Sequence, residues 1–197
     1  SQLDGSDTTV FARGLRNTIG FDWHPDTGEL YGMDHGIDWL GDEEQKEELN
    51  LLTENAHYGW PFIYGDGKAN PADQPENMSY EEFSEKVTMP LLLYNAHAAP
   101  LDMIFYQGEQ FLEEYRQDAF ITMHGSWNRS EPVGYNIVRL RFENNQPVEF
   151  EEFVTGFLVD NNTSHFGRVC GITTHPDGSL LVTDDHNGVI YRIAYQP

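Results

Sequence analysis

The chain has 197 residues, 39% of them hydrophobic and 13% aromatic, which is enough to fold around a core of its own. Its 33 acidic residues against 11 basic ones give a formal net charge of −22, which argues against binding to nucleic-acid phosphates or anionic membranes. No apolar stretch reaches 18 residues and Cys170 is the single cysteine, so we expect no membrane span and no disulfide within the chain.

The predicted elements are mostly short strands. Helical periodicity is scarce, and its best candidates are three short acidic stretches, residues 43–52, 79–86 and 109–116. Other apolar runs alternate with period two and are bounded by turn residues, as half-buried antiparallel strands are. These expected strands cover residues 28–33, 119–123, 136–142, 179–183 and 188–193. The pattern predicts an all-β fold, with residues 64–89 as a long loop rather than a domain linker.

An internal repeat narrows the fold. The sequence of residues 24–30 recurs at 175–180, each time as a tight Asp/Gly turn between two strands, and residues 33–36 resemble 183–186. The offset of 151 residues divides into three units of about 50 or four of about 38, both near the length of a propeller blade. We therefore predict one partial β-propeller domain over residues 1–197 that covers roughly four blades. A β-sandwich with two similar turns is the alternative.

Two motifs near the beginning predict a cofactor-and-metal site. Arg16–Asn17 combines a guanidinium with an amide, a pair suited to a planar ligand with several acidic groups. The carboxylates of Glu47–Asn50 and the aromatic corner of Tyr58–Pro61 follow, and clustered carboxylates can hold a hard cation. The alternative is a charged surface with no site.

Several motifs occur in an order that resembles the pyrroloquinoline-quinone (PQQ)-dependent soluble glucose/sorbosone dehydrogenase family, closest to its sorbosone-dehydrogenase-like branch. The resemblance spans nearly the whole chain and implies a six-bladed quinoprotein β-propeller that oxidises sugars, with PQQ near the central axis and calcium assisting. It is carried by residues 14–17, 38–42, 48–50, 58–61, 124–129, 167–168 and 177–185.

The resemblance implies which residues hold the cofactor. Arg16 and Asn17 fall on an Arg-Asn pair that contacts the quinone, and Arg168 falls on the first of two arginines placed over it. Cys170 stands where the second arginine would be. His124 or Arg129 is expected to take the place of a lysine that reaches the quinone in other branches, since no lysine follows Lys86.

It also implies two calcium sites. The backbone carbonyls of Gly36 and Ile37 would ligate a calcium ion on the cofactor side. Glu48, the carbonyl of Tyr58 and the region of Asp66 would hold a second, structural calcium ion, which makes physical sense because carboxylates drawn together repel one another without a cation.

The general base is the largest departure from the family. There it is a histidine on a blade preceding the Arg-Asn pair, but the fifteen residues before Arg16 contain no histidine. The catalytic residue is therefore unknown, and we expect either the C-terminal part of a larger enzyme or a shortened relative. Because an incomplete propeller leaves open strand edges, the expected partners include the missing N-terminal part or a second copy.

The predicted function is PQQ- and calcium-dependent oxidation of an aldose or related sugar, with a sugar and an electron acceptor as partners. The resemblance implies a periplasmic or secreted location. One alternative is a non-catalytic propeller module that binds carbohydrate or protein. Another is a calcium-dependent lactonase-type hydrolase. The Arg16–Asn17 pair and Arg168 favour the dehydrogenase over the hydrolase.

Overall fold

Three antiparallel sheets make up most of the computed structural model, which describes residues 2–196. The first sheet has the order β1 (Thr18–Trp23), β2 (Leu30–Asp34), β3 (Glu47–Leu52), β6 (Leu92–Tyr94). The second contains β7 (Pro100–Phe105), β8 (Ala119–Met123), β9 (Asn136–Glu143) and β10 (Gln146–Val154), again in chain order. The third consists of β13 (Val169–Thr174), β14 (Leu180–Asp184) and β15 (Val189–Ile193). The all-β prediction is confirmed.

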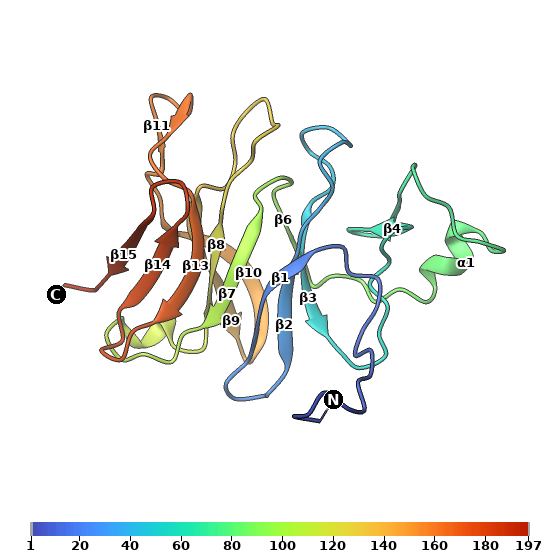
Figure 1. Cartoon of the computed structure of the whole chain (residues 1–197), viewed down its shortest axis with the longest axis horizontal. Coiled ribbons are helices and arrows are strands. Elements are labelled where there is room, and N and C mark those ends of the chain that lie inside the picture. The colour runs from blue at the N-terminus through green and yellow to red at the C-terminus, as the bar shows by residue number, and fades with distance from the viewer. Residues whose placement is uncertain (1, 197) are drawn as a thin grey trace.

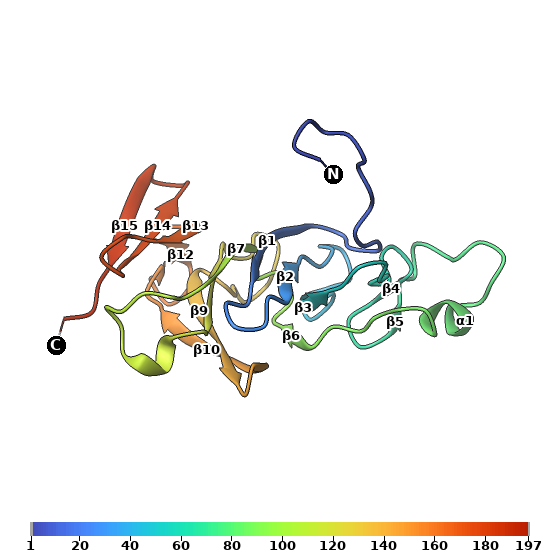
Figure 2. The same cartoon turned by 90° about the horizontal axis from the view of Figure 1, so that it is seen from below.

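The first strands of the three sheets, β1, β7 and β13, lie side by side (Figures 1 and 2). Gly20 in β1 permits this approach, because a Cβ there would lie 2.7 Å from the Cα of Asp102 in β7. Side chains then join the strands: Asp22 accepts a hydrogen bond from the backbone N–H of Phe105 at 2.8 Å, and Asp102 accepts one from Ile172 at 2.8 Å. The sheets fan out from this inner row as propeller blades do.

Two apolar cores lie between the three sheets, and β8 contributes to both. Every residue of β8 is buried, with Ile121 facing the first sheet and Phe120 facing the third. A strand buried on both faces reads as a continuous apolar run, which is why residues 119–123 were recognisable in the sequence. The core between the first and second sheets contains Tyr31, Met33, Leu49, Met103, Phe105 and Leu140, and the other contains Ile137, Val169, Ile172, Leu180 and Val182.

The repeated turns occupy equivalent places but lie two sheets apart. His24 donates its N–H to the carbonyl of Glu29 between β1 and β2, and His175 donates to Ser179 between β13 and β14, both at 2.8 Å. In the middle sheet the same connection is a longer segment, residues 106–118, with the 3₁₀ helix η1 (Glu113–Tyr115). The offset of 151 residues therefore spans two blades with insertions, and the expectation of roughly four blades is corrected to three sheets.

The longest insertion, residues 53–91, connects β3 to β6 and carries the ribbon β4 (Ile63–Tyr64)–β5 (Lys68–Ala69) and the helix α1 (Tyr80–Ser84). The helix begins at a capping box in which Ser79 and Glu82 satisfy each other's backbone N–H groups, so the prediction for residues 79–86 is confirmed. A second ribbon, β11 (Leu158–Val159)–β12 (Ser164–His165), precedes β13.

Residues 43–52 do not form the helix that their periodicity suggested. Residues 47–52 pair with β2 on one side and β6 on the other as strand β3, because burial between two sheets outweighs a weak helical preference. In residues 109–116, η1 is the helical part. Among residues 2–196, no helix is long and apolar enough to cross a membrane.

Candidate functional site

Antiparallel alternation brings most of the predicted site residues to one end of the sheets. The loops after β2 (35–46), β8 (124–135) and β14 (185–188), and the segments leading into β1, β7 and β13, all lie at the upper end of the sheets in Figure 1. We call this the site end. It carries the predicted residues Arg16, Asn17, Gly36, Ile37, His124, Arg129 and Arg168.

A buried carboxylate positions Arg16 and Asn17. Asp34, at the end of β2, accepts hydrogen bonds from the backbone N–H of Arg16 at 2.9 Å and of Asn17 at 2.7 Å. The hydroxyl of Thr18 donates to the same carboxylate at 2.7 Å. The backbone is thereby held where the chain enters β1, and the side chain of Asn17 stays exposed.

Arg168 is positioned by the same device two sheets away. Asp184, at the end of β14, is 2% exposed and accepts a hydrogen bond from the N–H of Arg168 at 3.2 Å. Burial opposes ionisation of Asp184, but hydrogen bonds from Asn187, from Tyr191 and from backbone amides outweigh it and lower its pKa to about 2. Asp184 therefore stays charged at neutral pH.

A continuous run of polar contacts joins the two arginines. Arg16 Nη1 donates to the carbonyl of His35 at 3.3 Å, and the ring of His35 contacts the carbonyl of Pro100 through Nε2. The neighbouring carbonyl of Ala99 accepts from the N–H of His124 at 2.9 Å. Arg168 Nε then donates to the carbonyl of His124 at 3.2 Å. Both guanidinium groups are thus part of one frame at one end of the molecule.

Each arginine also lies over an aromatic ring. The guanidinium carbon of Arg16 is 5.7 Å from the ring centroid of Trp60, and that of Arg168 is 5.4 Å from Tyr135. Such contacts hold a cation in place without consuming its hydrogen-bond donors. Arg168 also donates through Nη2 to the carbonyl of Gly125 at 2.5 Å. The arrangement suits a ligand with several anionic oxygens.

Glu47 fixes the backbone around Gly36. Its carboxylate accepts from the N–H of Gly36 at 2.8 Å and from the N–H of Ala99 at 2.9 Å, which ties the loop after β2 to the segment before β7. Burial is the main reason that the pKa of Glu47 rises to about 8. Gly36 tolerates no side chain, because a Cβ would lie 2.2 Å from the carbonyl oxygen of Gln45. Ile37 is buried and donates its N–H to Gln45 Oε1 at 3.2 Å.

Glu48 and Asn50 fit a hard cation. Glu48 is buried, and burial is the main cause that raises its pKa to about 7. It accepts from the N–H of Gly65 at 2.6 Å, and Asn50 Nδ2 donates to it at 3.4 Å. The buried Oδ1 of Asn50 has no hydrogen-bond partner among residues 2–196. A buried carboxylate beside an orphaned oxygen is a donor set that calcium accepts.

The other predicted ligands of this calcium ion differ in their surroundings. Asp66 is exposed and follows the Gly65 that contacts Glu48. Tyr58 is buried, and its hydroxyl donates to the carbonyl of Leu51 at 2.6 Å, so its side chain braces the start of the insertion. Among residues 2–196, no three His, Cys, Asp or Glu side chains form a ready metal cluster, and either predicted calcium site would need backbone and amide oxygens as ligands.

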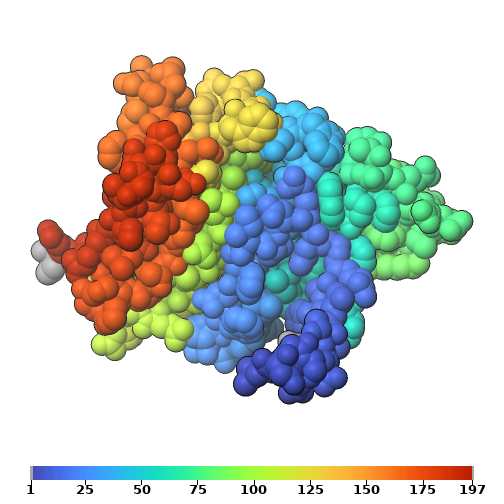
Figure 3. All heavy atoms as spheres, viewed as in Figure 1, coloured from blue at the N-terminus to red at the C-terminus, as the bar shows by residue number. Residues whose placement is uncertain are grey.

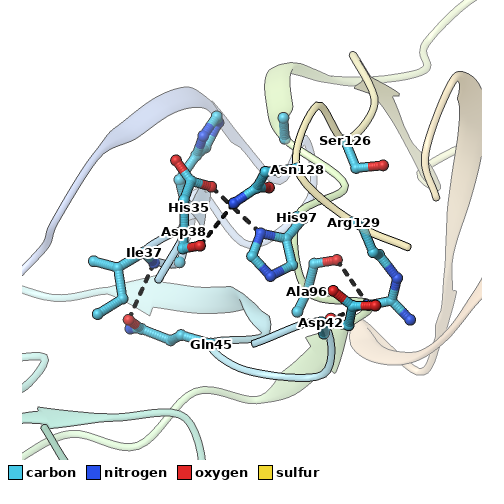
Figure 4. Close-up of polar contacts among 12 residues, drawn as sticks. His35, Ile37, Asp38, Asp42, Gln45, Ala96, His97, Ser126, Asn128 and Arg129 are labelled. Carbon is cyan, nitrogen blue, oxygen red and sulfur yellow. Dashed lines mark hydrogen bonds and ion pairs between the residues drawn. The ribbon is translucent and has the colours of Figure 1, made fainter. Parts of the chain in front are cut away.

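Arg129 braces two loops at the site end. Its side chain is 9% exposed and donates to the carbonyls of Asp42 and Ala96 (Figure 4). It also donates to the carbonyl of Glu131 and to the carboxylate of Glu43. A role in cofactor binding would require some of these bonds to be exchanged. Trp127, beside this region, is exposed and does not anchor the loop.

His124 has a different partner. Its Nε2 lies 2.9 Å from the carboxylate of Asp185, and this contact is the main cause that lowers the pKa of Asp185. Cys170 lies on the adjacent strand β13, and burial raises the pKa of its thiol, so it supplies no charge in place of a second arginine.

Sequence reasoning assigned no role to Asp34 and Asp184, and it named Glu47 and Trp60 only as members of a carboxylate pair and of an aromatic corner. A signal existed for the two aspartates, since residues 33–36 and 183–186 resemble each other. For Glu47 the signal was its place in the carboxylate pair Glu47–Glu48 at the start of a strand. The contact of Trp60 with Arg16 depends on how the insertion folds back on the first sheet, which no local pattern shows.

Comparison with known proteins shows related sequences. The chain is 39% identical over 191 residues to an uncharacterised protein of Borreliella burgdorferi, covering 95% of this chain and 49% of that protein. It is 43% identical over 178 residues to a pyrroloquinoline quinone-dependent pyranose dehydrogenase of Coprinopsis cinerea, covering 78% of this chain and 24% of that protein. The chain thus spans half or less of the length of these relatives.

Solved structures share the fold. A Trichoderma reesei carbohydrate-active enzyme of family AA12, solved as a calcium structure, has a TM-score of 0.80 at 22% identity over 94% of this chain and 53% of its own. The PQQ domain of Coprinopsis cinerea pyranose dehydrogenase, in its holo form, has a TM-score of 0.71 at 21% identity over 93% of this chain and 55% of its own.

A family model also matches most of the chain. The model described as TrAA12-like matches residues 54–196, which is well over half of the chain and includes Arg129, Arg168 and the second and third sheets. The chain therefore belongs to the TrAA12-like family.

Proposed function

We propose that the protein binds PQQ at the site end and, with calcium, takes part in the oxidation of an aldose or related sugar. The observation that carries this proposal is that Arg16 and Arg168, far apart in the sequence, belong to one hydrogen-bonded frame at one end of the sheets. The relative from Coprinopsis cinerea, a PQQ-dependent pyranose dehydrogenase, supports it. The sorbosone-dehydrogenase-like branch is part of the proposal and rests on the sequence motifs.

The chemistry follows from charge. PQQ, when bound, would supply the acceptor for the hydride, two electrons with one proton, that leaves the hydroxyl-bearing carbon of a sugar, while the hydroxyl proton would pass to the general base. Arg16 and Arg168 would neutralise its carboxylates and the negative charge that grows on the reduced quinone oxygens. Asn17 adds an exposed amide beside Arg16, and His124, held by Asp185, adds a polar group beside Arg168. The general base is proposed to come from blades outside this chain.

Calcium completes the proposal. The carbonyls of Gly36 and Ile37 lie in a loop whose amides are held by Glu47 and Gln45, so they are available as rigid cofactor-side ligands. Glu48 and Asn50 would hold the structural ion, with Asp66 and the carbonyl of Tyr58 as further predicted ligands. The electron acceptor, a periplasmic or secreted location, and pairing with an N-terminal part or a second copy are further parts of the proposal.

Quinone binding tests this proposal directly. We expect added PQQ to quench the tryptophan fluorescence of the chain, because Trp60 lies against Arg16. The variant Arg16→Ala should bind PQQ at least about tenfold more weakly, since it loses charge-assisted hydrogen bonds to a carboxylate. Arg141→Ala is the matched control, because Arg141 pairs with Glu143 and Glu149 on the outer strands of the second sheet.

The outcome is read from titrations of the two variants side by side. Circular dichroism establishes that both are folded as the wild type is. If Arg16→Ala and wild type bind PQQ with the same affinity, the assignment of the site end to the quinone is wrong.

A further inference from the structure

Two tryptophans stand exposed at the site end. Trp39, in the loop after β2, is 64% exposed, and Trp127, in the loop after β8, is 75% exposed. Most other large exposed apolar side chains have a simpler explanation, because they lie on strands at the open ends of the three-sheet stack or in terminal segments. These include Val10, Phe11, Ile19, Phe21, Trp23, Val189, Ile190 and Tyr195.

The two tryptophans are next to residues that bond to each other. Asn128, which follows Trp127, donates through Nδ2 to the carbonyl of Asp38, which precedes Trp39, at 2.7 Å (Figure 4). The loops that carry the two tryptophans meet on the surface at the upper edge of Figure 3. The two tryptophans therefore stand on loops that touch each other, and we call the surface of these two loops the rim.

This rim is held rigidly. Buried His97 contacts the carboxylate of Asp38 at 3.3 Å and the carbonyl of Gly41 at 2.8 Å, so the loop after β2 is tied to the segment before β7. Ser130 donates its N–H to Asp42 Oδ2 at 3.0 Å, and Arg129 bonds to the backbone of Asp42 and to Glu43. Two large apolar side chains thus stay exposed to water on braced loops, although their burial would be favourable.

We propose that Trp39 and Trp127 form a stacking subsite for the pyranose rings of a neutral oligosaccharide, so that the substrate is an extended saccharide rather than a single sugar. This inference rests on the proposed function, since it extends the same end of the molecule outward. The apolar C–H face of a pyranose ring packs against the electron-rich face of an indole. Because the loops that carry the rings are already ordered, binding costs little of their conformational entropy.

The negative charge of the rim favours a neutral saccharide over an anionic one. Asp38 and Glu43 have side chains 43% and 75% exposed, and Asp42 lies between them in the sequence. These carboxylates accept hydrogen bonds from sugar hydroxyls and repel uronic acids or sulfated sugars. A protein partner is less suited, because two separate rings set among carboxylates lack the apolar centre of a protein interface.

The test measures binding of cello-oligosaccharides of one to six glucose units to the full chain by calorimetry. We expect affinity to rise with the second and third unit. The double variant Trp39→Ala/Trp127→Ala should bind the longer chains about tenfold or more weakly than wild type. Trp39→Phe/Trp127→Phe should restore most of the loss, because a phenyl ring also stacks. Trp23→Ala is the matched control, since Trp23 is 55% exposed at the far end of β1.

Three results would overturn the inference: equal binding of the long saccharides by the double alanine variant and wild type, no dependence of affinity on chain length, or tighter binding of oligogalacturonates than of neutral chains. PQQ binding by the same variants is measured in parallel and should be unchanged. If saccharide binding contradicts the subsite but the wild type binds PQQ, the proposed function is unaffected. If the wild type does not bind PQQ, the proposed function itself is contradicted.

Discussion

At the scale of single residues, two buried carboxylates hold the backbone at the site end. Asp34 and Asp184 end equivalent strands, and each accepts the backbone N–H of an arginine at the site end. Asp184 accepts further hydrogen bonds from the amides of His186 and Asn187 and from the hydroxyl of Tyr191 at 2.8 Å. A charged acceptor of this kind stabilises more than a neutral one. Both carboxylates are buried, and each holds the backbone that leads into the first strand of its sheet.

Replacement of Asp184 by Asn should reveal what its charge contributes. We expect Asp184→Asn to lower the free energy of unfolding by about 2 kcal/mol at pH 7, because several donors lose a charged acceptor. The folded pKa of about 2 lies below the ordinary value of 3.8, so this stabilisation is present above pH 3.8 and is lost as pH falls toward 2. Urea denaturation measured from pH 7 to pH 2.5 follows both effects.

The control for this measurement is Glu54→Gln, which changes an exposed carboxylate. We expect it to alter the free energy of unfolding by less than about 0.5 kcal/mol. A difference between Asp184→Asn and wild type that stays constant down to pH 2.5 would show that the charge of Asp184 is not the source of its effect.

At the scale of elements, strand β3 and the insertion that follows it form one unit. Glu48 in β3 contacts Gly65 beside the ribbon β4–β5, and Trp60 in the same insertion packs on Arg16. A cation at Glu48 and Asn50 would therefore stabilise the insertion and, through Trp60, the position of Arg16. The proposed structural calcium and the proposed cofactor residue Arg16 are thus both in contact with the same insertion.

Calcium should raise the melting temperature of the chain through Glu48. Calcium at about 100 times its dissociation constant adds about 2.7 kcal/mol, which corresponds to roughly 5–10 °C for a chain of this size. The variant Glu48→Gln should lose most of this shift, while Glu54→Gln keeps it. The melting temperature is measured by calorimetry with calcium and with EDTA. If Glu48→Gln keeps the full increase caused by calcium, the ion does not bind at Glu48.

The loops of the site end form a second unit, held by Arg129. In Arg129→Lys the side chain keeps its charge but loses the planar array of donors that reaches Asp42, Ala96 and Glu43. We expect faster amide hydrogen exchange in residues 36–46 and 124–134, with β8 and β14 protected as before. Unchanged exchange in both loops would show that Arg129 does not brace them.

At the scale of the whole molecule, three sheets enclose two cores and leave two sheet faces open. On the first sheet, Ile19, Phe21 and Trp23 of β1 are each about half exposed or more, whereas the middle sheet is covered on both sides. Apolar faces of this kind associate, but the net charge of −22 opposes contact between copies at low salt.

We therefore expect self-association that grows with salt. In 2 M NaCl, sedimentation should give a mass above the 22.6 kDa of one chain, and in 0.1 M NaCl a mass closer to it. The double variant Phe21→Ser/Trp23→Ser should shift the high-salt species toward the monomer. A monomer at every salt and protein concentration would show that the open faces do not hold copies together.

Much of the fold was predictable because its signals are local. The alternating runs of β9, β14 and β15, the repeated Asp/Gly turns and the capping box of α1 each depend on neighbours in the sequence. The number of blades was not predictable, because the middle sheet replaces the repeated turn by residues 106–118 and so hides the period. Strand β3 was mistaken for a helix because its pairing with β2 and β6, and the amides of Gly36, Ala99 and Gly65 that bind its carboxylates, lie outside the segment.

The sequence by itself determined the all-β class, the repeated turns and the motifs that mark Arg16, Asn17 and Arg168, because strand alternation and turn chemistry act over a few residues. Only the tertiary structure decided that the two arginines share one frame, that Arg129 braces loops, and that Trp39 and Trp127 stand together on a rim. These relations join residues from different sheets. They arise from how antiparallel strands deliver distant loops to the same end, and no local pattern encodes that placement.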